Sequence, residues 1–217
     1  MKAAALISGG KDSLYAVHIC RKQGIDVAHL VAVISENPES YMWHYPNAEL
    51  TKCQAEALGI PIVYVKTKGE KEKELDELKN GIKKLMVDAV ITGAVASNYQ
   101  KERIEKLCSE LKLKHLSPLW GRNQEELVHE MIDSGMEIII TAVAADGLTK
   151  EWLGKLIDKK TVDELKKLNV SVVGEGGEFE TFVLFMPGFN KRLKVKQSKE
   201  HWKEDSGFLE IKELEAV

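Results

Sequence analysis

Residues 3–13 read Ala3-Ala4-Ala5-Leu6-Ile7-Ser8-Gly9-Gly10-Lys11-Asp12-Ser13, a short apolar run that breaks into a glycine loop. The apolar run predicts a buried strand, and residues 13–23 predict a helix that ends at Gly24. A glycine loop between the first strand and the first helix is where an open α/β sheet binds anions, at the carboxyl ends of its strands. The stretch therefore predicts an α/β fold with an anion site in this loop.

The residue types of the loop suit a phosphate group. Its two glycines let the backbone come close to an oxyanion, while successive amides and the helix N-terminus supply partial positive charge. The two serine hydroxyls can donate further hydrogen bonds, and Lys11 adds a full charge. Asp12 repels phosphate, so its natural task is to help hold a Mg²⁺ ion that the phosphates share. From the residues alone, a plain Gly-Gly turn with a serine N-cap remains an alternative.

The rest of the chain alternates strand-like and helix-like segments as far as about residue 145. The expected strands cover residues 27–34, 62–65, 89–92 and 138–143, and the expected helices cover residues 47–58, 68–84, 97–111 and 123–135. This alternation predicts a Rossmann-like parallel sheet with helices on both faces. After Asp146 the pattern changes to short helices and alternating strands, so we expect two domains, residues 1–145 and a smaller α+β domain over residues 146–217.

Composition narrows the function classes. The chain has 217 residues with 31 basic and 34 acidic side chains, a net charge of −3. It therefore carries no global positive charge for nucleic acid or membrane. Three scattered cysteines without a Cys-x-x-Cys pair favour a reducing compartment, and the N-terminal apolar run is too short for a secretory signal or a membrane span. We expect a cytoplasmic protein; the oligomeric state stays open, a homodimer included.

The form Ser-Gly-Gly-x-Asp-Ser resembles the pyrophosphate loop of the N-type ATP pyrophosphatases, in the adenine-nucleotide α-hydrolase-like (HUP-type) superfamily. Further segments resemble one branch of it, the diphthine–ammonia ligases. These segments are Met42-Trp43-His44-Tyr45-Pro46-Asn47, Gln54-Ala55-Glu56-Ala57-Leu58-Gly59-Ile60-Pro61, Gly93-Ala94-Val95-Ala96-Ser97-Asn98-Tyr99-Gln100 with Arg103 and Glu105, Pro118-Leu119-Trp120, and Gly174-Glu175-Gly176-Gly177-Glu178-Phe179-Glu180-Thr181. The resemblance covers residues 8–181.

The resemblance implies an activity. ATP is cleaved between its α and β phosphates, the diphthine carboxylate of translation elongation factor two becomes an acyl-adenylate, and ammonium displaces AMP. ATP and Mg²⁺ are the implied cofactors, with Lys11 and Asp12 catalytic and Asp12 on the metal. The implied nucleotide-binding residues are Ser8, Gly9, Gly10, Lys11, Asp12, Ser13 and Gly93.

Residues 174–181, called here the acidic segment, offer three further catalytic candidates, Glu175, Glu178 and Glu180. If Glu178 starts a strand, its carboxylate and that of Glu180 share one face with Phe179 opposite. The glutamates could offset the quaternary ammonium of diphthine, capture and deprotonate ammonium, or join the Mg²⁺ shell. Without the resemblance, the segment would be a surface glycine turn before an edge strand. The substrate-binding candidates of the segment are Gly176, Gly177 and Phe179.

Other substrate candidates lie outside the acidic segment. They are His44, Asn47, Tyr99, Gln100 and Arg103. The planar fork of Arg103 suits a phosphate or a carboxylate, although a solvent-facing arginine and a packed Tyr99 fit equally well. His44 could line a substrate pocket, but a loop histidine is more often structural.

Two rival functions stay open. One is a tRNA-modifying ATP pyrophosphatase of the same superfamily, although the paired cysteines of its sulfur-transferring members are absent and the net charge offers little to RNA. The other is a nucleotide sensor without turnover. A basic stretch over residues 191–203 alternates like an edge strand, or forms a docking surface for the elongation factor.

Overall fold

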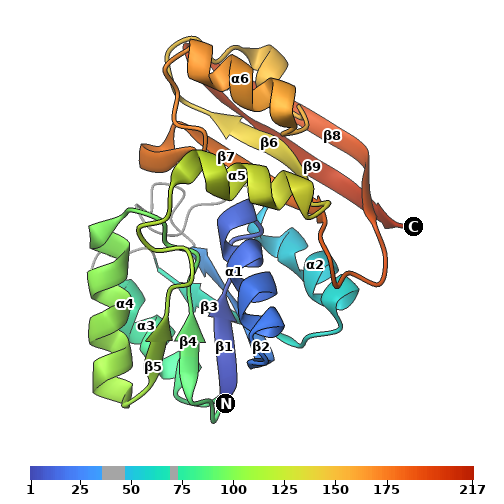
Figure 1. The fold of residues 1–217 in the computed structure, drawn as a ribbon. Helices are drawn as coiled ribbons and strands as arrows, with labels where there is room; N and C mark the ends of the chain where they lie inside the picture. The colour runs from blue at the N-terminus through green and yellow to red at the C-terminus, as the bar shows by residue number, and fades with distance from the viewer. Residues whose placement is uncertain (36–46, 69–72) are drawn as a thin grey trace.

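A five-stranded parallel sheet forms the N-terminal part of the protein (Figure 1). The computed structural model describes residues 1–35, 47–68 and 73–217. The strand order is β3-β2-β1-β4-β5, and every neighbouring pair is parallel. The strands are β1 (Lys2–Leu6), β2 (Asp26–Ser35), β3 (Ile62–Thr67), β4 (Ala89–Ile91) and β5 (Lys114–Leu116).

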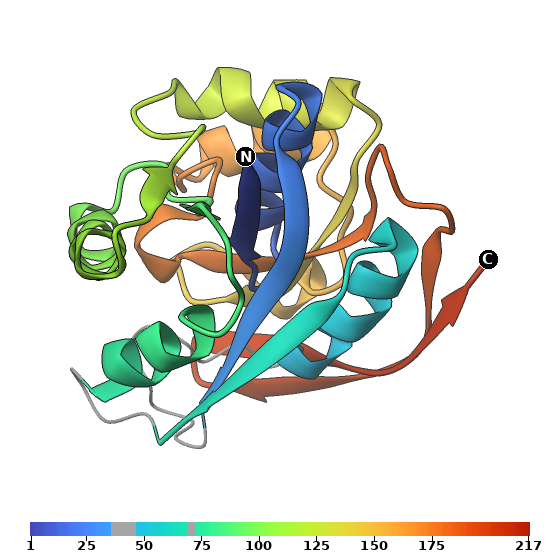
Figure 2. The same ribbon diagram turned by 90° about the horizontal axis from the view of Figure 1, so that it is seen from below.

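Helices cover both faces of this sheet (Figure 2). Side chains on β1 alternate between two apolar clusters, one on each face of the sheet. Ala3 and Ala5 pack into one cluster with the first two helices of the chain, whereas Ala4 and Leu6 pack into the second cluster with the next two helices. A strand that is buried on both faces reads as a continuous apolar run. The helices are α1 (Lys11–Lys22), α2 (Thr51–Leu58), α3 (Lys73–Ile82) and α4 (Asn98–Leu111).

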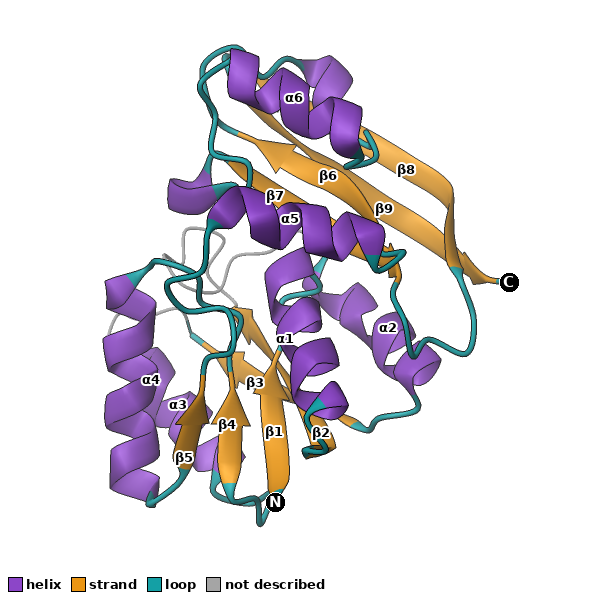
Figure 3. Ribbon diagram, viewed as in Figure 1, coloured by secondary structure: helices purple, strands orange, loops and turns teal. Residues whose placement is uncertain are grey.

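The C-terminal part is a four-stranded antiparallel sheet with the order β7-β6-β9-β8 (Figure 3). Its strands are β6 (Glu137–Val143), β7 (Phe179–Phe185), β8 (Leu193–Lys203) and β9 (Ser206–Ala216). The remaining helices are α5 (Gln124–Asp133) and α6 (Lys159–Lys167), with the short 3-10 turns η1 (Ala48–Leu50), η2 (Lys150–Trp152) and η3 (Glu175–Gly177). The predicted fold class, a Rossmann-like parallel sheet with helices on both faces plus a smaller α+β part, is confirmed.

The strand predicted over residues 138–143 exists as β6, but it belongs to the second sheet, where it pairs with β7 and β9. A run of buried isoleucines fits a parallel and an antiparallel sheet equally, so its partners could not be read from the residues. How the chain divides into domains stays a prediction; the sheet membership of β6 favours a division ahead of it.

The free edge of the second sheet lies against the glycine loop of the first. The amide of Val183 in β7 donates to the carbonyl of Gly9 at 3.0 Å. Gln54 of α2 closes the contact, because its Nε2 donates to the carbonyls of Gly9 (3.0 Å) and Val183 (2.8 Å). An edge strand needs such a cover. Here the cover holds the loop and β7 together, and it places the acidic segment, which runs from η3 into β7, beside the loop.

Within the described ranges 1–35, 47–68 and 73–217, no helix is both long and apolar enough to cross a bilayer.

Candidate active site

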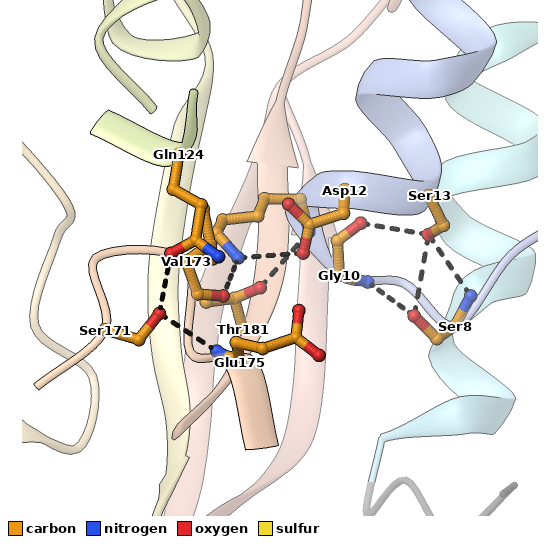
Figure 4. Close-up of polar contacts among 10 residues, drawn as sticks. Ser8, Gly10, Asp12, Ser13, Gln124, Ser171, Val173, Glu175 and Thr181 are labelled. Carbon is orange, nitrogen blue, oxygen red and sulfur yellow. Dashed lines mark hydrogen bonds and ion pairs between the residues drawn. The ribbon is translucent and has the colours of Figure 1, made fainter. Parts of the chain in front are cut away.

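The loop of residues 8–13 is held by its own serines (Figure 4). The Ser8 hydroxyl accepts from the amide of Gly10 at 3.3 Å, and the Ser13 hydroxyl donates to the Gly10 carbonyl at 3.0 Å. The Ser8 amide in turn donates to the Ser13 hydroxyl at 3.3 Å. Gly10 is the N-cap of α1 and has no side chain to occupy the first-turn amides. The loop therefore presents a helix N-terminus and the Ser8 hydroxyl at the carboxyl end of β1, as an anion site requires.

Lys11 is buried, with an exposed fraction of only 2%. Its Nζ donates to Asp12 Oδ2 at 2.8 Å and to the Val173 carbonyl at 2.6 Å, and it lies 5.6 Å from the centre of the Phe179 ring. A desolvated ammonium is tolerated only with such partners. Lys11 thus joins the glycine loop to the segment that leads into β7, and its positive charge lies between the two sheets.

Asp12 fits a magnesium ion. Its Oδ2 binds Lys11, whereas its Oδ1 is buried with no hydrogen-bond partner in the described structure. A buried carboxylate oxygen left without a partner is costly unless a cation or water completes it. No group of three or more His, Cys, Asp or Glu side chains within the described ranges could hold a metal. Mg²⁺ commonly takes one or two carboxylates and completes its shell with water and substrate phosphates. Asp12 would serve as that ligand.

Gly93, just after β4, lies against the start of α1. A Cβ atom there would lie 2.5 Å from the carbonyl carbon of Asp12 and 2.5 Å from the amide of Ser13. Any side chain would collide with backbone that cannot move without displacing the loop. The close approach of the chain explains why a glycine stands at position 93 beside the loop; its role in nucleotide binding stays a prediction.

A cavity of about 230 Å³ opens between the loop and the acidic segment. The predicted residues that line it are Ser8, Gly10, Lys11, Asp12, Ser13, Gly93, Gln100, Glu175, Gly176, Gly177, Phe179 and Glu180. Figure 4 shows the Glu175 side chain directed from η3 toward the loop. The two parts of the sequence that carry the most motif residues therefore form one site.

The expected arrangement of the acidic segment is wrong in one respect. Strand β7 begins at Phe179, and Glu178 before it has helical backbone angles (φ −59°, ψ −37°). The carboxylate of Glu178 turns away and accepts from the Ser171 amide at 2.7 Å, whereas Phe179 and Glu180 both line the cavity. The alternation of a strand starts only after the glycine turn ends, so the spacing alone misplaced Glu178. Glu178 supports the turn.

Glu180 has an altered pKa. Burial raises the pKa of its carboxyl from 4.5 to about 7; the nearby negative charge of Asp12 adds to the rise, and the positive charge of Lys11 opposes it. Desolvation disfavours the charged form of an acid, which is the expected cause at a part-buried site. Perturbed acids of this kind gather at functional sites.

Three other predicted substrate residues have structural partners. The Arg103 guanidinium stacks on the Tyr99 ring at 4.1 Å, and neither side chain lines the cavity. Asn47 is buried: its Nδ2 donates to the Leu209 carbonyl at 3.0 Å, and its Oδ1 accepts from the Ile211 amide at 3.0 Å. Asn47 thus satisfies the edge of β9 where that strand leaves β6.

Gly9 contacts β7 and Gln54, and it does not line the cavity. His44 lies outside the described residues.

Some residues at the site were not predicted. The Thr181 hydroxyl accepts a hydrogen bond from the Lys11 amide at 3.1 Å. Thr92 lines the cavity, and its Oγ1 lies 2.8 Å from the Nε2 of His115. Burial lowers the pKa of His115. Thr92 directly follows the third residue of β4, so the rule that sites form at the carboxyl ends of parallel strands could have identified it.

Together, the parallel sheet, the glycine loop after its first strand and the buried Lys11–Asp12 pair define the class: an α/β protein with a candidate anion site at the carboxyl end of its first strand. Models of the diphthamide synthase N-terminal domain and of the diphthamide synthase C-terminal domain match residues 1–115 and 123–217. The chain belongs to the diphthamide synthase family.

Individual relatives agree with this assignment. Proteins named diphthine–ammonia ligase from Bos taurus and Homo sapiens are each 38% identical over 224 residues, which cover 91% of this chain and 84% of theirs. The protein of that name from Schizosaccharomyces pombe is 34% identical over 98% of this chain and 39% of its own length. These relatives are ligases that form a carbon–nitrogen bond, so the predicted family and enzyme class are confirmed. Membership of a ligase family implies that the reaction uses ATP.

One solved structure is also similar. A chain described as a predicted subunit of tRNA methyltransferase from Methanocaldococcus jannaschii aligns with a TM-score of 0.47 and 17% identity, over 86% of this chain and 98% of that chain. A likeness at this level has no bearing on function.

Proposed function

We propose that the protein uses ATP and ammonium to amidate the diphthine carboxylate of translation elongation factor two, through an acyl-adenylate, and releases AMP and pyrophosphate. One observation carries the proposal: the glycine loop and the acidic segment, each with a separate chemical task, line a single cavity. The relatives named diphthine–ammonia ligase support the choice of substrate and nitrogen donor.

The loop side of the cavity suits pyrophosphate release. A carboxylate is a poor acyl donor until one of its oxygens becomes part of a good leaving group, and adenylation achieves this. The charge that develops on the departing pyrophosphate would be met by the first-turn amides of α1 that follow Lys11, by the Ser8 hydroxyl, and by the field of Lys11. Groups already fixed by internal hydrogen bonds need no reorganisation during the reaction, which is the main source of such electrostatic catalysis.

Asp12 would hold the magnesium ion through the oxygen that has no protein partner. Mg²⁺, when bound, shields the phosphate charges from the attacking carboxylate. Lys11 fixes the other Asp12 oxygen at 2.8 Å, so the free oxygen keeps one direction. Lys11 is therefore proposed to have two roles: it offsets phosphate charge, and it orients the metal ligand.

The acidic side of the cavity suits ammonium. Ammonia attacks only as the neutral molecule, so a proton must leave the ammonium ion or the tetrahedral adduct. Glu175 and Glu180 are the carboxylates of the acidic segment that line the cavity. With its pKa raised to about 7, Glu180 can exchange a proton near neutral pH, the condition for an effective general base.

The sulfur-transferring rival fits poorly with the described cysteines. Cys20 and Cys108 are buried, and burial raises the pKa of each thiol to about 11. A thiol in that state is protonated at neutral pH and is a poor nucleophile. Burial also raises the pKa of the half-buried Cys53, and none of these three cysteines lines the cavity.

The acyl-adenylate step can be tested by isotope transfer. Elongation factor two whose diphthine carboxylate carries heavy oxygen is incubated with the protein, ATP, Mg²⁺ and ammonium. We expect one heavy oxygen in the phosphate of the released AMP, because the carboxylate attacks the α-phosphorus. Formation of ADP and phosphate, or AMP that carries no label, would refute the step.

A further inference from the structure

Four side chains form a row across the second sheet: Glu180 on β7, Ala142 on β6, Phe208 on β9 and His201 on β8. The register pairs Glu180 with Ala142, Ala142 with Phe208, and Phe208 with His201. Residues directly opposite one another on antiparallel strands project from the same face. The four side chains, called here the cross-strand row, therefore lie on one face of the sheet.

The cross-strand row has aromatic side chains at one end, a small alanine in the middle and a carboxyl group at the other end. The rings of His201 and Phe208 are stacked, with centres 4.5 Å apart and planes 8° apart. His201 is further held by Glu210, whose Oε2 lies 2.8 Å from its Nε2. Ala142 carries only a methyl group, so it leaves a gap between Phe208 and Glu180. Those two residues are two strands apart, a separation of about 10 Å.

A groove follows this gap. Its lining includes all four residues of the cross-strand row, together with Trp202 and Gly207 at the end of the β8–β9 hairpin. A Cβ at Gly207 would lie 2.4 Å from the Trp202 ring, so only glycine allows the indole to lie across the strand there. The Trp202 indole is itself fixed, because its Nε1 donates to the Glu204 carbonyl at 3.0 Å.

The charges in the groove favour a cation with an apolar surface. Glu180 supplies the carboxylate of the groove. Glu200 also lines the groove, but it is adjacent to His201 on β8, so its side chain leaves from the other face and pairs with Lys150 at 2.8 Å. Lys203 lines the groove and is exposed. Aromatic faces attract quaternary ammonium groups, which carry a charge but no hydrogen to donate. An aromatic stack, an alanine methyl and a carboxylate offer such a group cation–π contact, apolar contact and charge balance.

Glu180 lines this groove and also the cavity beside the glycine loop. In diphthine the carboxylate and the quaternary ammonium sit on one carbon, so both groups would lie next to Glu180, the residue that the groove and the cavity share. We propose that the groove over Ala142, between Glu180 and Phe208, binds the quaternary ammonium of the substrate while its carboxylate enters the loop cavity. The inference rests on the proposed function for the identity of the substrate, but the cation site can be tested without turnover.

The first test uses choline as the probe, with the neutral alcohol in which carbon replaces its nitrogen as the matched ligand. Each is titrated into the full chain, free of ATP, with labelled alanine methyl groups followed by NMR; the Ala142 signal is assigned with the Ala142→Ser variant. We expect choline to shift the Ala142 signal saturably and at least about tenfold more tightly than the neutral analogue. Equal binding of the two ligands, or choline shifts that spare Ala142, would overturn the proposal.

The second test uses matched variants. Phe208→Leu keeps an apolar side chain and removes the aromatic face, so we expect choline affinity to fall about tenfold. Phe185→Leu changes an aromatic residue of the same sheet, one that packs edge-on against Phe189, and should leave choline affinity unchanged. Equal affinity of Phe208→Leu and the unaltered protein, with ATP binding intact in both, would count against the site.

The two proposals fail separately. If Phe208→Leu raises the KM for the diphthine-bearing factor and leaves kcat nearly unchanged, both stand. Full amidation by Phe208→Leu with an unaltered KM would refute the cation site but not the ligase activity. Choline binding at Ala142 in a protein that never amidates the factor would support the cation site and refute diphthine as the substrate.

Discussion

Replacement of Glu180 by glutamine tests whether burial between the loop cavity and the groove raises the pKa of this carboxyl. In the unfolded chain the group titrates near 4.5, and in the folded protein its pKa is raised to about 7. The folded state therefore holds more protons between these values, so stability from this group is full below pH 4.5 and is lost as the pH rises through about 7. At about 1.4 kcal/mol per pH unit, the full shift corresponds to about 3 kcal/mol. Solvent that reaches Glu180 through the cavities reduces this to about 1–3 kcal/mol.

Glutamine has the shape of the protonated acid and does not ionise. The free energy of unfolding, measured by urea denaturation without ATP or Mg²⁺, should therefore be about 1–3 kcal/mol higher for Glu180→Gln than for the unaltered protein at pH 8, and nearly equal at pH 5. Glu213→Gln, an exposed change on β9, serves as the control for loss of one negative charge. A Glu180→Gln difference that is the same at both pH values, or lower stability of the variant at pH 8, would refute the electrostatic reasoning.

Three further predictions concern other parts of the site. Gly93→Ala should weaken ATP binding by more than about tenfold, since the new Cβ would lie 2.5 Å from the Ser13 amide; unchanged affinity in a calorimetric titration would contradict the close approach. Asn47→Ala should lower the free energy of unfolding by about 2–3 kcal/mol through two lost hydrogen bonds to β9, with the KM for the factor unchanged in the folded variant. A raised KM would restore Asn47 as a substrate residue. Changing Lys194 and Lys196 to glutamate should weaken binding of the elongation factor and spare ATP binding, measured by surface plasmon resonance; equal factor affinity would mean that β8 is only a solvated edge strand.

Local patterns made the glycine loop and the first sheet predictable. Residues 3–13 contain a buried strand, a turn and a helix start within a few residues, and anion binding at that junction follows from backbone geometry alone. The start of α5 at Asn123 is another local feature, because the Asn123 Oδ1 accepts from the Glu126 amide at 3.1 Å and caps the helix. The edge position of β8 also follows its alternating pattern.

Contacts between distant parts of the chain were not predictable in the same way. The partners of Asn47 are 162 and 164 residues away, and the Val173 carbonyl that binds Lys11 is 162 residues away. The sheet that contains β6, and the register that aligns Glu180 with Phe208, depend on pairings and on a bulge near Thr141. Spacing in the sequence carries no information about such registers, because one inserted residue reverses the face.

In the proposed reaction, one cavity couples ATP cleavage to amide formation. The most direct measurement incubates the purified protein with ATP, Mg²⁺, ammonium and elongation factor two that carries diphthine, and follows AMP by chromatography and the factor by mass spectrometry. We expect equal amounts of AMP and amidated factor, no AMP without the modified factor, and loss of both products in Asp12→Asn. ATP binding with no AMP and no change in the mass of the factor would refute the coupled reaction and indicate a nucleotide sensor.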